Sequence, residues 1–242
     1  MDQIVEANLR RYKDGEIVDE YMREFYHRLR IKNALWMMEK ECRKRNDIKI
    51  SDTKVLEIAG ATGIVSSRLI KKGYCVTLAD ISPEALKIAR HRNRRLETIQ
   101  MDATKKFPFN NNSFDVIFAA DIIEHIFDTR LFLNECNRCL KPNGILVITT
   151  PNLASLQDRI RFLFGKSPRQ VNPLHEYLYL HIRPFTYETL KHAMEDSGFT
   201  DFKLTTNMVK INLGKMQINL VLVGKLFPSI GRSLIVSAHS KA

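Results

Sequence analysis

Three acidic residues stand at the carboxyl ends of predicted strands: Glu57, Asp80 and Asp102. Asp80 follows Glu57 by about twenty positions, a spacing that places an acid to accept hydrogen bonds from both hydroxyls of a ribose. Asp102 is followed by Ala103, at a position suited to reading an adenine amino group. Because open α/β sheets bind ligands at the carboxyl ends of their strands, we expect these residues to line one ligand site.

A loop of small residues follows the first of these acids. Segment 55–63 reads VLEIAGATG, so that Ala59, Gly60, Ala61 and Gly63 lie between a buried strand and the start of a helix. Small side chains let a ligand approach the backbone, and a helix N-terminus presents unpaired N–H groups. The loop is therefore expected to bind through its backbone.

Two nucleotide cofactors suit this arrangement, and the sequence favours one of them. A dinucleotide needs G-x-G-x-x-G, whereas positions 59, 61 and 64 are Ala, Ala and Ile. A pyrophosphate is also poorly served by acids at both Glu57 and Asp102. S-adenosylmethionine carries no phosphate, and its sulfonium and amino groups are cationic, so three carboxylates stabilise it electrostatically. We expect S-adenosylmethionine as the cofactor.

The elements that must position these residues alternate between strand and helix. Apolar runs predict strands at 54–59, 74–79, 97–101, 114–120 and 144–149, with two more at 202–206 and 233–238. Ser82, Asp128 and Thr186 are expected to cap helices, the second ending at a turn over 141–144 and the third at Gly198. This order predicts a doubly wound, mostly parallel, seven-stranded α/β sheet in a single domain over 1–242.

Two further regions are expected to cover this sheet. Residues 1–50 have a helical pattern and are expected to pack beside it. Residues 153–164 predict an amphipathic helix with Leu153, Leu156, Ile160 and Leu163 on one face. The aromatic-rich stretch 166–185 is too long for a simple connection, so we expect it to be a lid over the acceptor pocket.

Five segments resemble, in order, the motifs of the class I S-adenosylmethionine-dependent methyltransferases, which have a Rossmann-like fold. The resemblance covers roughly residues 50–200. The segments are VLEIAGATG (55–63), GYCVTLADISPEALKIAR (73–90), MDA (101–103), FDVIFAADIIEHI (114–126) and KPNGILVITTPN (141–152).

The resemblance implies which residues contact the cofactor. They are Glu57, the 59–63 backbone, Asp80 with its neighbour Ile81, Asp102 with Ala103, and the strand end near Asp121. The chain departs from the family at Ala59 and Ala61, where glycine is usual. If either position needs a positive φ, alanine costs roughly 1 kcal/mol. A relative that binds the cofactor without catalysis is therefore the alternative from another functional class.

Glu124 and His125 are the candidate catalytic residues, because they follow the fourth strand beside the expected methyl position. Methyl transfer depends mainly on proximity and orientation, but a hydroxyl or protonated amine acceptor needs a base, and histidine serves near neutral pH. The alternative is that both residues begin a helix and make structural hydrogen bonds.

Two subfamilies share the segment DIIEHI with TTPN and the later HEYLYLHIRPF. One comprises ubiquinone-biosynthesis-type O-methyltransferases and relatives acting on small molecules, lipids and saccharides. The other comprises RNA 2′-O-methyltransferases that bind a metal through E-x-x-E-H and a later histidine. Asp121 replaces the first Glu of that pattern, while Glu124 and His125 match it, and His175 or His181 would complete it. We favour the first group and expect no metal.

Composition bounds the partners and the compartment. The chain of 242 residues has a net charge of +11, which favours an anionic partner. No aromatic-basic RNA module is visible, so a small-molecule or saccharide acceptor is favoured over nucleic acid. No apolar run reaches membrane-spanning length, and the N-terminus is polar. Cys136 and Cys139 fall on one helical stripe with Phe132 and are expected in the core of a reduced, cytoplasmic protein. The sequence indicates neither the acceptor nor the oligomeric state.

Overall fold

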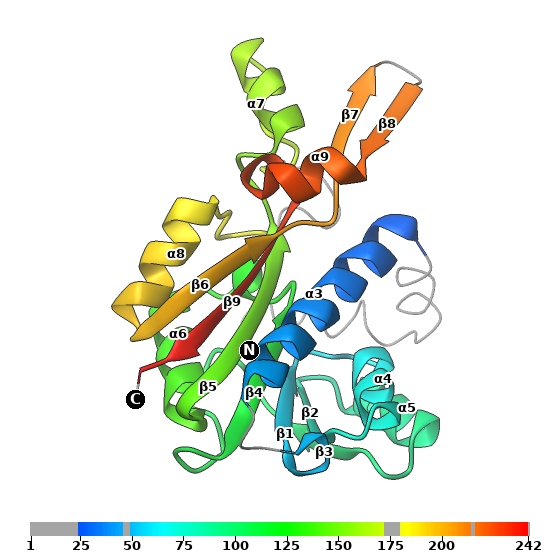
Figure 1. Cartoon of the computed structure of the whole chain (residues 1–242), viewed down its shortest axis with the longest axis vertical. Coiled ribbons are helices and arrows are strands. Elements are labelled where there is room, and N and C mark those ends of the chain that lie inside the picture. Colours follow the sequence, from blue (N-terminus) through cyan, green and yellow to red (C-terminus); the bar gives the residue numbers. More distant parts are fainter. Residues whose placement is uncertain (1–23, 46–48, 172–179, 214–215, 242) are drawn as a thin grey trace.

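The computed structural model describes residues 24–45, 49–171, 180–213 and 216–241 (Figure 1). Its main sheet has seven strands in the order β3-β2-β1-β4-β5-β9-β6. Strands β1 to β5 are parallel, and β9 is antiparallel to both β5 and β6. The strands are β1 (Lys54–Ile58), β2 (Cys75–Asp80), β3 (Glu97–Gln100), β4 (Phe114–Ala120), β5 (Leu140–Pro151), β6 (Phe199–Thr205) and β9 (Ser233–Ser240). The predicted mostly parallel seven-stranded sheet is confirmed.

Helices cover both faces of the sheet, which is why the central strands are apolar along their whole length. One face is covered by α3 (Phe25–Lys44), α4 (Ile64–Lys71) and α5 (Pro83–Arg92), and the other by α6 (Thr129–Cys139) and α8 (Tyr187–Asp196) (Figure 1). Each face has its own cluster of buried side chains. Helix α3 is the described part of the expected N-terminal cover, and residues 1–23 lie outside the described residues.

The predicted helix starts are confirmed by their capping hydrogen bonds. The side chain of Ser82 accepts from the N–H of Ala85, and that of Asp128 accepts from the N–H of Leu131. Thr186 begins α8 with a reciprocal capping box. These caps satisfy N–H groups that the first helical turn leaves without partners. They therefore fix where each helix leaves the sheet.

One local prediction is wrong. Residues 141–144, expected as a turn, lie inside β5, where the register with β4 shifts and Asn143 adopts a φ of 59°. The helix predicted over 153–164 is present as α7 (Leu156–Leu163), but its apolar face is not buried, since Ile160 is 40% and Leu163 is 80% exposed. The helix packs against the β7 strand of a separate hairpin and not on the sheet, so its apolar stripe has no core to face.

That hairpin was not predicted. It comprises β7 (Val209–Leu213) and β8 (Met216–Leu220) and continues into α9 (Val221–Leu226). The hairpin, α7 and α9 gather at one end of the molecule, beyond the main sheet (Figure 1). Three short 3-10 helices complete the described elements: η1 (Ile50–Asp52), η2 (Ile123–His125) and η4 (Pro228–Ile230). Among the described residues, no helix combines the length and apolarity that a membrane span requires.

Candidate active site

The loop after β1 runs through three left-handed backbone positions. The φ angles are 57° at Ala59, 46° at Ala61 and 70° at Gly63. Both alanines thus have the positive φ for which a cost was expected from the sequence. An alanine in this region is strained by contact between its Cβ and the backbone. Gly60 has a different constraint: a Cβ there would lie 2.4 Å from the carboxyl carbon of Glu57. The loop is held in a conformation that favours glycine, although the sequence supplies glycine at only two of the four small positions.

Glu57 lies beneath this loop and is almost fully buried, with 3% of its surface exposed. The hydroxyl of Ser66 on α4 donates to its Oε2. Burial raises the pKa of Glu57 to about 7, and the Ser66 hydrogen bond offsets only part of that effect. A cationic group brought close to this carboxyl would favour its charged form.

Asp80 joins the loop to the end of β2. Its Oδ2 accepts from the N–H of Ala61 at 2.8 Å, and its Oδ1 accepts from the N–H of Ser82 at 2.9 Å. Burial raises the pKa of Asp80, while hydrogen bonds from Ser82, Ala61 and Ile81 lower it in part. A carboxylate oxygen has two lone pairs, so each oxygen keeps acceptor capacity for a ribose hydroxyl.

Asp102 and Ala103 follow β3, the edge strand next to β2, and both are partly exposed. Thr104 donates to Asp102 Oδ1 from its N–H at 2.9 Å and from its hydroxyl at 2.6 Å. Burial raises the pKa of Asp102, but these hydrogen bonds and the nearby Lys105 outweigh it and hold the pKa below its ordinary value. Asp102 is therefore an ionised group at the same edge as Asp80.

Asp121 follows β4 and has a φ of 52°. Its Oδ1 accepts from the Thr149 hydroxyl at 2.9 Å, and its Oδ2 forms an ion pair with Arg30 of α3. The expected cofactor residue is thus at the carboxyl edge, but its carboxylate holds Arg30 and Thr149. Arg30 itself was missed from the sequence, because no motif distinguishes it from the other arginines of α3.

Glu124 lies in η2 and is 1% exposed. Its Oε2 accepts from the hydroxyl of Thr150, at the end of β5, at 2.9 Å. Burial, with the charge of Asp121, raises the pKa of Glu124 well above its ordinary value, and Thr150 and Arg30 offset part of this. Burial and the Asp121 charge thus both favour the protonated form of Glu124.

His125 is the next residue of η2, and its ring is fixed by a later segment of the chain. Its Nδ1 donates to the carbonyl of Leu180 at 2.9 Å, and the ring of His181 lies edge-on, 5.0 Å away between centroids. With the proton on Nδ1, the lone pair of the neutral imidazole is on Nε2. This is the tautomer that a base acting through Nε2 requires.

Glu124, His125 and His181 also meet the geometry for holding a metal ion. Each contributes one ligand atom, and these atoms lie within 4.8 Å of one another. A carboxylate with two imidazoles suits a divalent transition metal. His175, the other expected ligand, lies outside the described residues.

The stretch expected to cover the acceptor pocket meets this group in its described part. Besides the Leu180 carbonyl, the N–H of Arg183 donates to the carbonyl of Glu124 at 3.1 Å, and the N–H of Leu153 donates to the carbonyl of Phe185 at 2.8 Å. Residues 180–185 therefore lie along the carboxyl edge of β4 and β5. The part over 172–179 lies outside the described residues.

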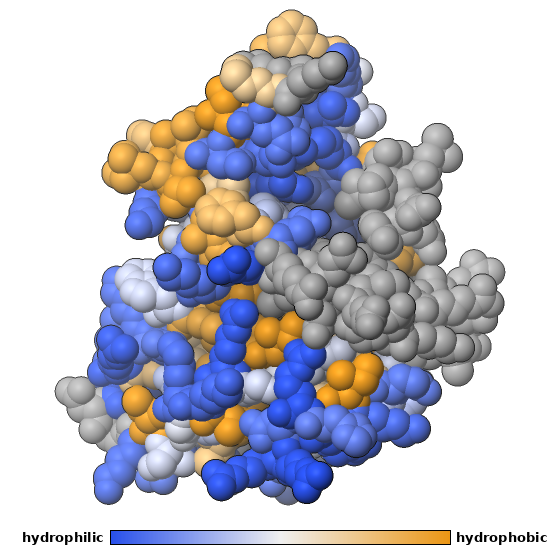
Figure 2. Space-filling model, turned by 90° about the vertical axis from the view of Figure 1, so that its right-hand side faces the viewer, coloured by the Kyte–Doolittle hydropathy of each residue, from blue (hydrophilic) through white to orange (hydrophobic). Residues whose placement is uncertain are grey.

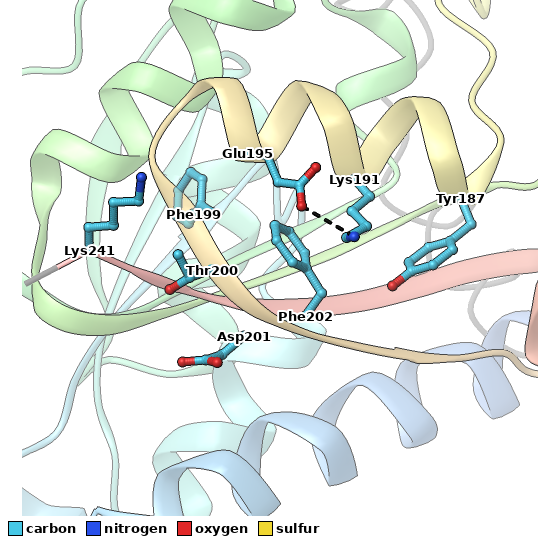
Figure 3. Close-up of a pocket in the computed structure, with 8 residues that line it drawn as sticks. All are labelled: Tyr187, Lys191, Glu195, Phe199, Thr200, Asp201, Phe202 and Lys241. Carbon is cyan, nitrogen blue, oxygen red and sulfur yellow. Dashed lines mark ion pairs between the residues drawn. The ribbon is translucent and has the colours of Figure 1, made fainter.

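A separate hollow of about 570 Å³ lies between α8 and β6, lined by Tyr187, Lys191, Glu195, Phe199–Phe202 and Lys241 (Figure 3). Glu195 and Lys191 form an ion pair across its wall. Because His239 pairs with Ile145 near the start of β5, Lys241 lies beyond the amino ends of the parallel strands. The hollow is thus at the edge opposite the acidic group and is not the expected cofactor site.

Known proteins resemble this chain in sequence and in fold. A sequence profile described as a methyltransferase domain matches residues 56–148. The ubiquinone/menaquinone biosynthesis C-methyltransferase of Hahella chejuensis is 31% identical over 183 residues, which cover 66% of this chain and 73% of that protein. An S-adenosylmethionine-dependent methyltransferase structure from Thermotoga maritima has a TM-score of 0.63 at 20% identity, covering 93% of this chain and 97% of that one.

A second solved structure shows the same fold with its ligand. The Haemonchus contortus phosphoethanolamine N-methyltransferase 2, in complex with S-adenosyl-L-methionine, has a TM-score of 0.58 at 17% identity. It covers 86% of this chain, which spans 53% of that protein. At these identities the structural likeness shows the fold, and the sequence likeness to the Hahella protein shows the family.

Proposed function

Because this chain belongs to the class I S-adenosylmethionine-dependent methyltransferases, we propose that it transfers a methyl group to a hydroxyl oxygen of a small-molecule or saccharide acceptor. The observation that carries this proposal is His125, which is fixed through Nδ1 at the edge where the carboxylates gather. The four cysteines are in no disulfide, which suits a reducing compartment, and we place the enzyme in the cytoplasm.

The residues at the carboxyl edge suit the cofactor in shape and charge. Glu57, Asp80 and Asp102 supply carboxyl groups for a ligand with cationic ends and a ribose, and the loop over 59–63 carries only small side chains. When bound, S-adenosylmethionine supplies an electrophilic methyl group on its sulfonium. We propose that Asp80 holds the ribose and that Asp102 and Ala103 contact the adenine.

The chain's own contribution to chemistry is orientation and proton removal. Nε2 of His125 takes the proton of the acceptor hydroxyl, so that the oxygen attacks as an anion. Asp121 positions Arg30, and Glu124 fixes the end of β5 by accepting a hydrogen bond from Thr150. Residues 166–185 are proposed to enclose the acceptor, since their described end contacts both Glu124 and His125.

The experiment that tests this function is a screen of acceptor pools with methyl-labelled S-adenosylmethionine, followed by identification of the labelled product. Label on an oxygen of a small molecule supports the proposal. The same base would activate a ring carbon beside a phenolic hydroxyl, and the Hahella relative is named as a C-methyltransferase. Label on carbon would therefore keep the base and correct the acceptor atom.

A second candidate function is metal-assisted 2′-O-methylation of RNA. It is favoured by the convergence of Glu124, His125 and His181, whose candidate ligand atoms lie within 4.8 Å of one another. Two experiments distinguish the functions. A metal enzyme loses activity when a chelator is added. RNA binding weakens steeply as the salt concentration rises, because binding releases counterions. We expect activity that resists chelators.

A further inference from the structure

Three cationic side chains from separate elements converge beside the active site. Arg169 follows α7, Lys210 lies in β7 and Arg232 precedes β9. Burial and then the charge of Arg232 lower the pKa of Arg169, and burial followed by the charges of Arg232 and Arg169 lowers the pKa of Lys210. The positive charges thus repel one another, and Asp158 offsets part of this effect at Arg169. A bound anion would stabilise such a cluster further.

Three guanidinium nitrogen atoms of this cluster have no hydrogen-bond acceptor among the described residues. The Nε and Nη2 atoms of Arg169 and the Nε of Arg232 are buried without a partner. Buried donors are almost always paired, because an unpaired one loses its hydration without compensation. Three such atoms in one place indicate an acceptor that binds there.

Of the described carboxylates, Asp158 and Glu24 act on the cluster, and they neutralise only part of its positive charge. Asp158 Oδ1 lies 3.7 Å from Arg169 Nε, but it already accepts from the Arg169 backbone N–H at 2.9 Å. Asp158 Oδ2 accepts from the Ser155 hydroxyl at 2.6 Å. Glu24 also acts on Lys210, yet its side chain is 66% exposed and largely solvated.

The ring of Tyr26 links the cluster to Arg30, which pairs with an active-site carboxylate. The guanidinium carbon of Arg232 is 4.0 Å from the ring centroid of Tyr26, and that of Arg30 is 5.8 Å from the same centroid. Arg30 pairs with Asp121. The Arg232 carbonyl also accepts from the N–H of Asn152, directly after β5. Tyr26, Arg30 and the end of β5 therefore connect the cluster to the carboxyl edge of the sheet.

We propose that Arg169, Lys210 and Arg232 bind a phosphate group of the methyl acceptor. Two guanidinium forks and one ammonium suit the several oxygens and the double charge of a phosphate. This assignment rests on the proposed function, because it takes the ligand to be the acceptor. It narrows the acceptor to a phosphorylated molecule, which is either soluble or a phospholipid.

The test measures binding of inorganic phosphate to the full chain by calorimetry, at constant ionic strength set with sodium chloride. The wild type is expected to bind saturably, with R169Q and R232Q weakened at least tenfold and R232K weakened less. R94Q is the matched control, since Arg94 is an exposed arginine beyond α5. Thermal unfolding of every variant shows that each one is folded.

Two further measurements separate the possible failures. S-adenosylmethionine binding is measured on the same samples. A wild type that does not bind the cofactor contradicts the proposed function. A wild type that binds the cofactor but not phosphate contradicts the phosphate site. Equal phosphate affinity in R232Q and R94Q also overturns it. Displacement of phosphate by glycerol 3-phosphate indicates a soluble acceptor, and displacement only by short-chain phosphatidic acid indicates a lipid.

A different observation concerns the end formed by α7, the hairpin and α9. Six large apolar side chains there are 59–80% exposed: Phe162, Leu163, Phe164, Leu222, Leu226 and Phe227. Figure 2 shows apolar surface at this upper end of the molecule, beside hydrophilic side chains. Apolar side chains that gather in this way mark an interaction site more often than an ordinary surface.

The charges around these side chains select the partner. Arg159, Lys166 and Lys225 are exposed there, and no Asp or Glu occurs after Asp201. Asp158, the acid of α7, is 1% exposed. Apolar side chains among cations bind the boundary between anionic headgroups and acyl chains. We infer that this end docks on an anionic membrane surface.

Cosedimentation with vesicles tests this inference. The full chain is expected to sediment with vesicles of phosphatidylcholine and phosphatidylglycerol, and at least fivefold less with phosphatidylcholine alone. The double variant L163D/F164D should lose binding, while W36D should keep it, because Trp36 is 57% exposed on α3. Equal sedimentation of both variants overturns the inference. A concentration-dependent dimer that the double variant abolishes would also overturn it, by assigning the surface to self-association.

Discussion

The Oδ2 atom of Asp80 accepts a hydrogen bond from the backbone N–H of Ala61 at 2.8 Å. One carboxylate thus ties the end of β2 to the small-residue loop that follows β1. The contact orders the loop before any ligand binds, which reduces the conformational entropy that binding would otherwise remove. The same carboxylate is the group we expect to hold the ribose.

Replacement of Asp80 by alanine should weaken binding of S-adenosylmethionine by about 1.5–3 kcal/mol, the range for hydrogen bonds to a charged group. Calorimetry measures this directly. Asp80→Asn separates charge from shape, since it keeps one oxygen acceptor and should lose less. A dissociation constant unchanged in Asp80→Ala would contradict the assignment.

Glycine at position 59 or 61 should stabilise the protein. A left-handed alanine costs about 1–2 kcal/mol, and the extra freedom of glycine in the unfolded chain costs about 0.5–1 kcal/mol. Ala59→Gly and Ala61→Gly should therefore each raise the free energy of unfolding by up to about 1 kcal/mol, as measured in urea.

The control for these variants is Ala193→Gly, in the helix α8, which should lower the free energy of unfolding by about 1 kcal/mol. If all three substitutions destabilise alike, the left-handed conformation of the loop is wrong.

Replacement of His125 by alanine should lower turnover roughly a hundredfold or more while cofactor affinity stays intact, because the proton acceptor is lost. Chelators should have no effect, and His181→Ala should cost much less than His125→Ala. Inhibition by a chelator that added divalent metal reverses, with equal damage from both variants, would assign Glu124, His125 and His181 to a metal and favour the RNA function.

Glu57 should make stability depend on pH. Its pKa rises from an ordinary 4.5 to about 7 in the folded protein, so the folded state holds a proton that the unfolded state releases. The stabilisation is present below pH 4.5 and is lost as pH rises through about 7, a change of about 3 kcal/mol. The free energy of unfolding of the wild type, measured in urea, should fall between pH 5 and 8 relative to that of Glu57→Gln. Parallel curves for the two proteins would show that Glu57 is ionised when folded.

Local sequence patterns were sufficient to predict the strands of the main sheet and the acidic residues at its carboxyl edge. Strands buried on both faces are apolar throughout, and helices between them are capped by residues such as Ser82 and Asp128, so their positions can be read from short windows. Once parallel strands are assigned, Glu57, Asp80 and Asp102 must share an edge. The hairpin β7–β8 was missed because its strands belong to no buried sheet and give no continuous apolar run.

The sequence by itself determined the fold class, the cofactor and the shared strand edge of Glu57, Asp80 and Asp102, because those depend on the order and type of neighbouring residues. Only the tertiary structure decided that Arg30 pairs with Asp121, that Leu180 fixes the ring of His125, and that Arg169, Lys210 and Arg232 converge. Each of these contacts joins segments far apart in the chain. Their partners are selected by packing in space, which no local periodicity encodes.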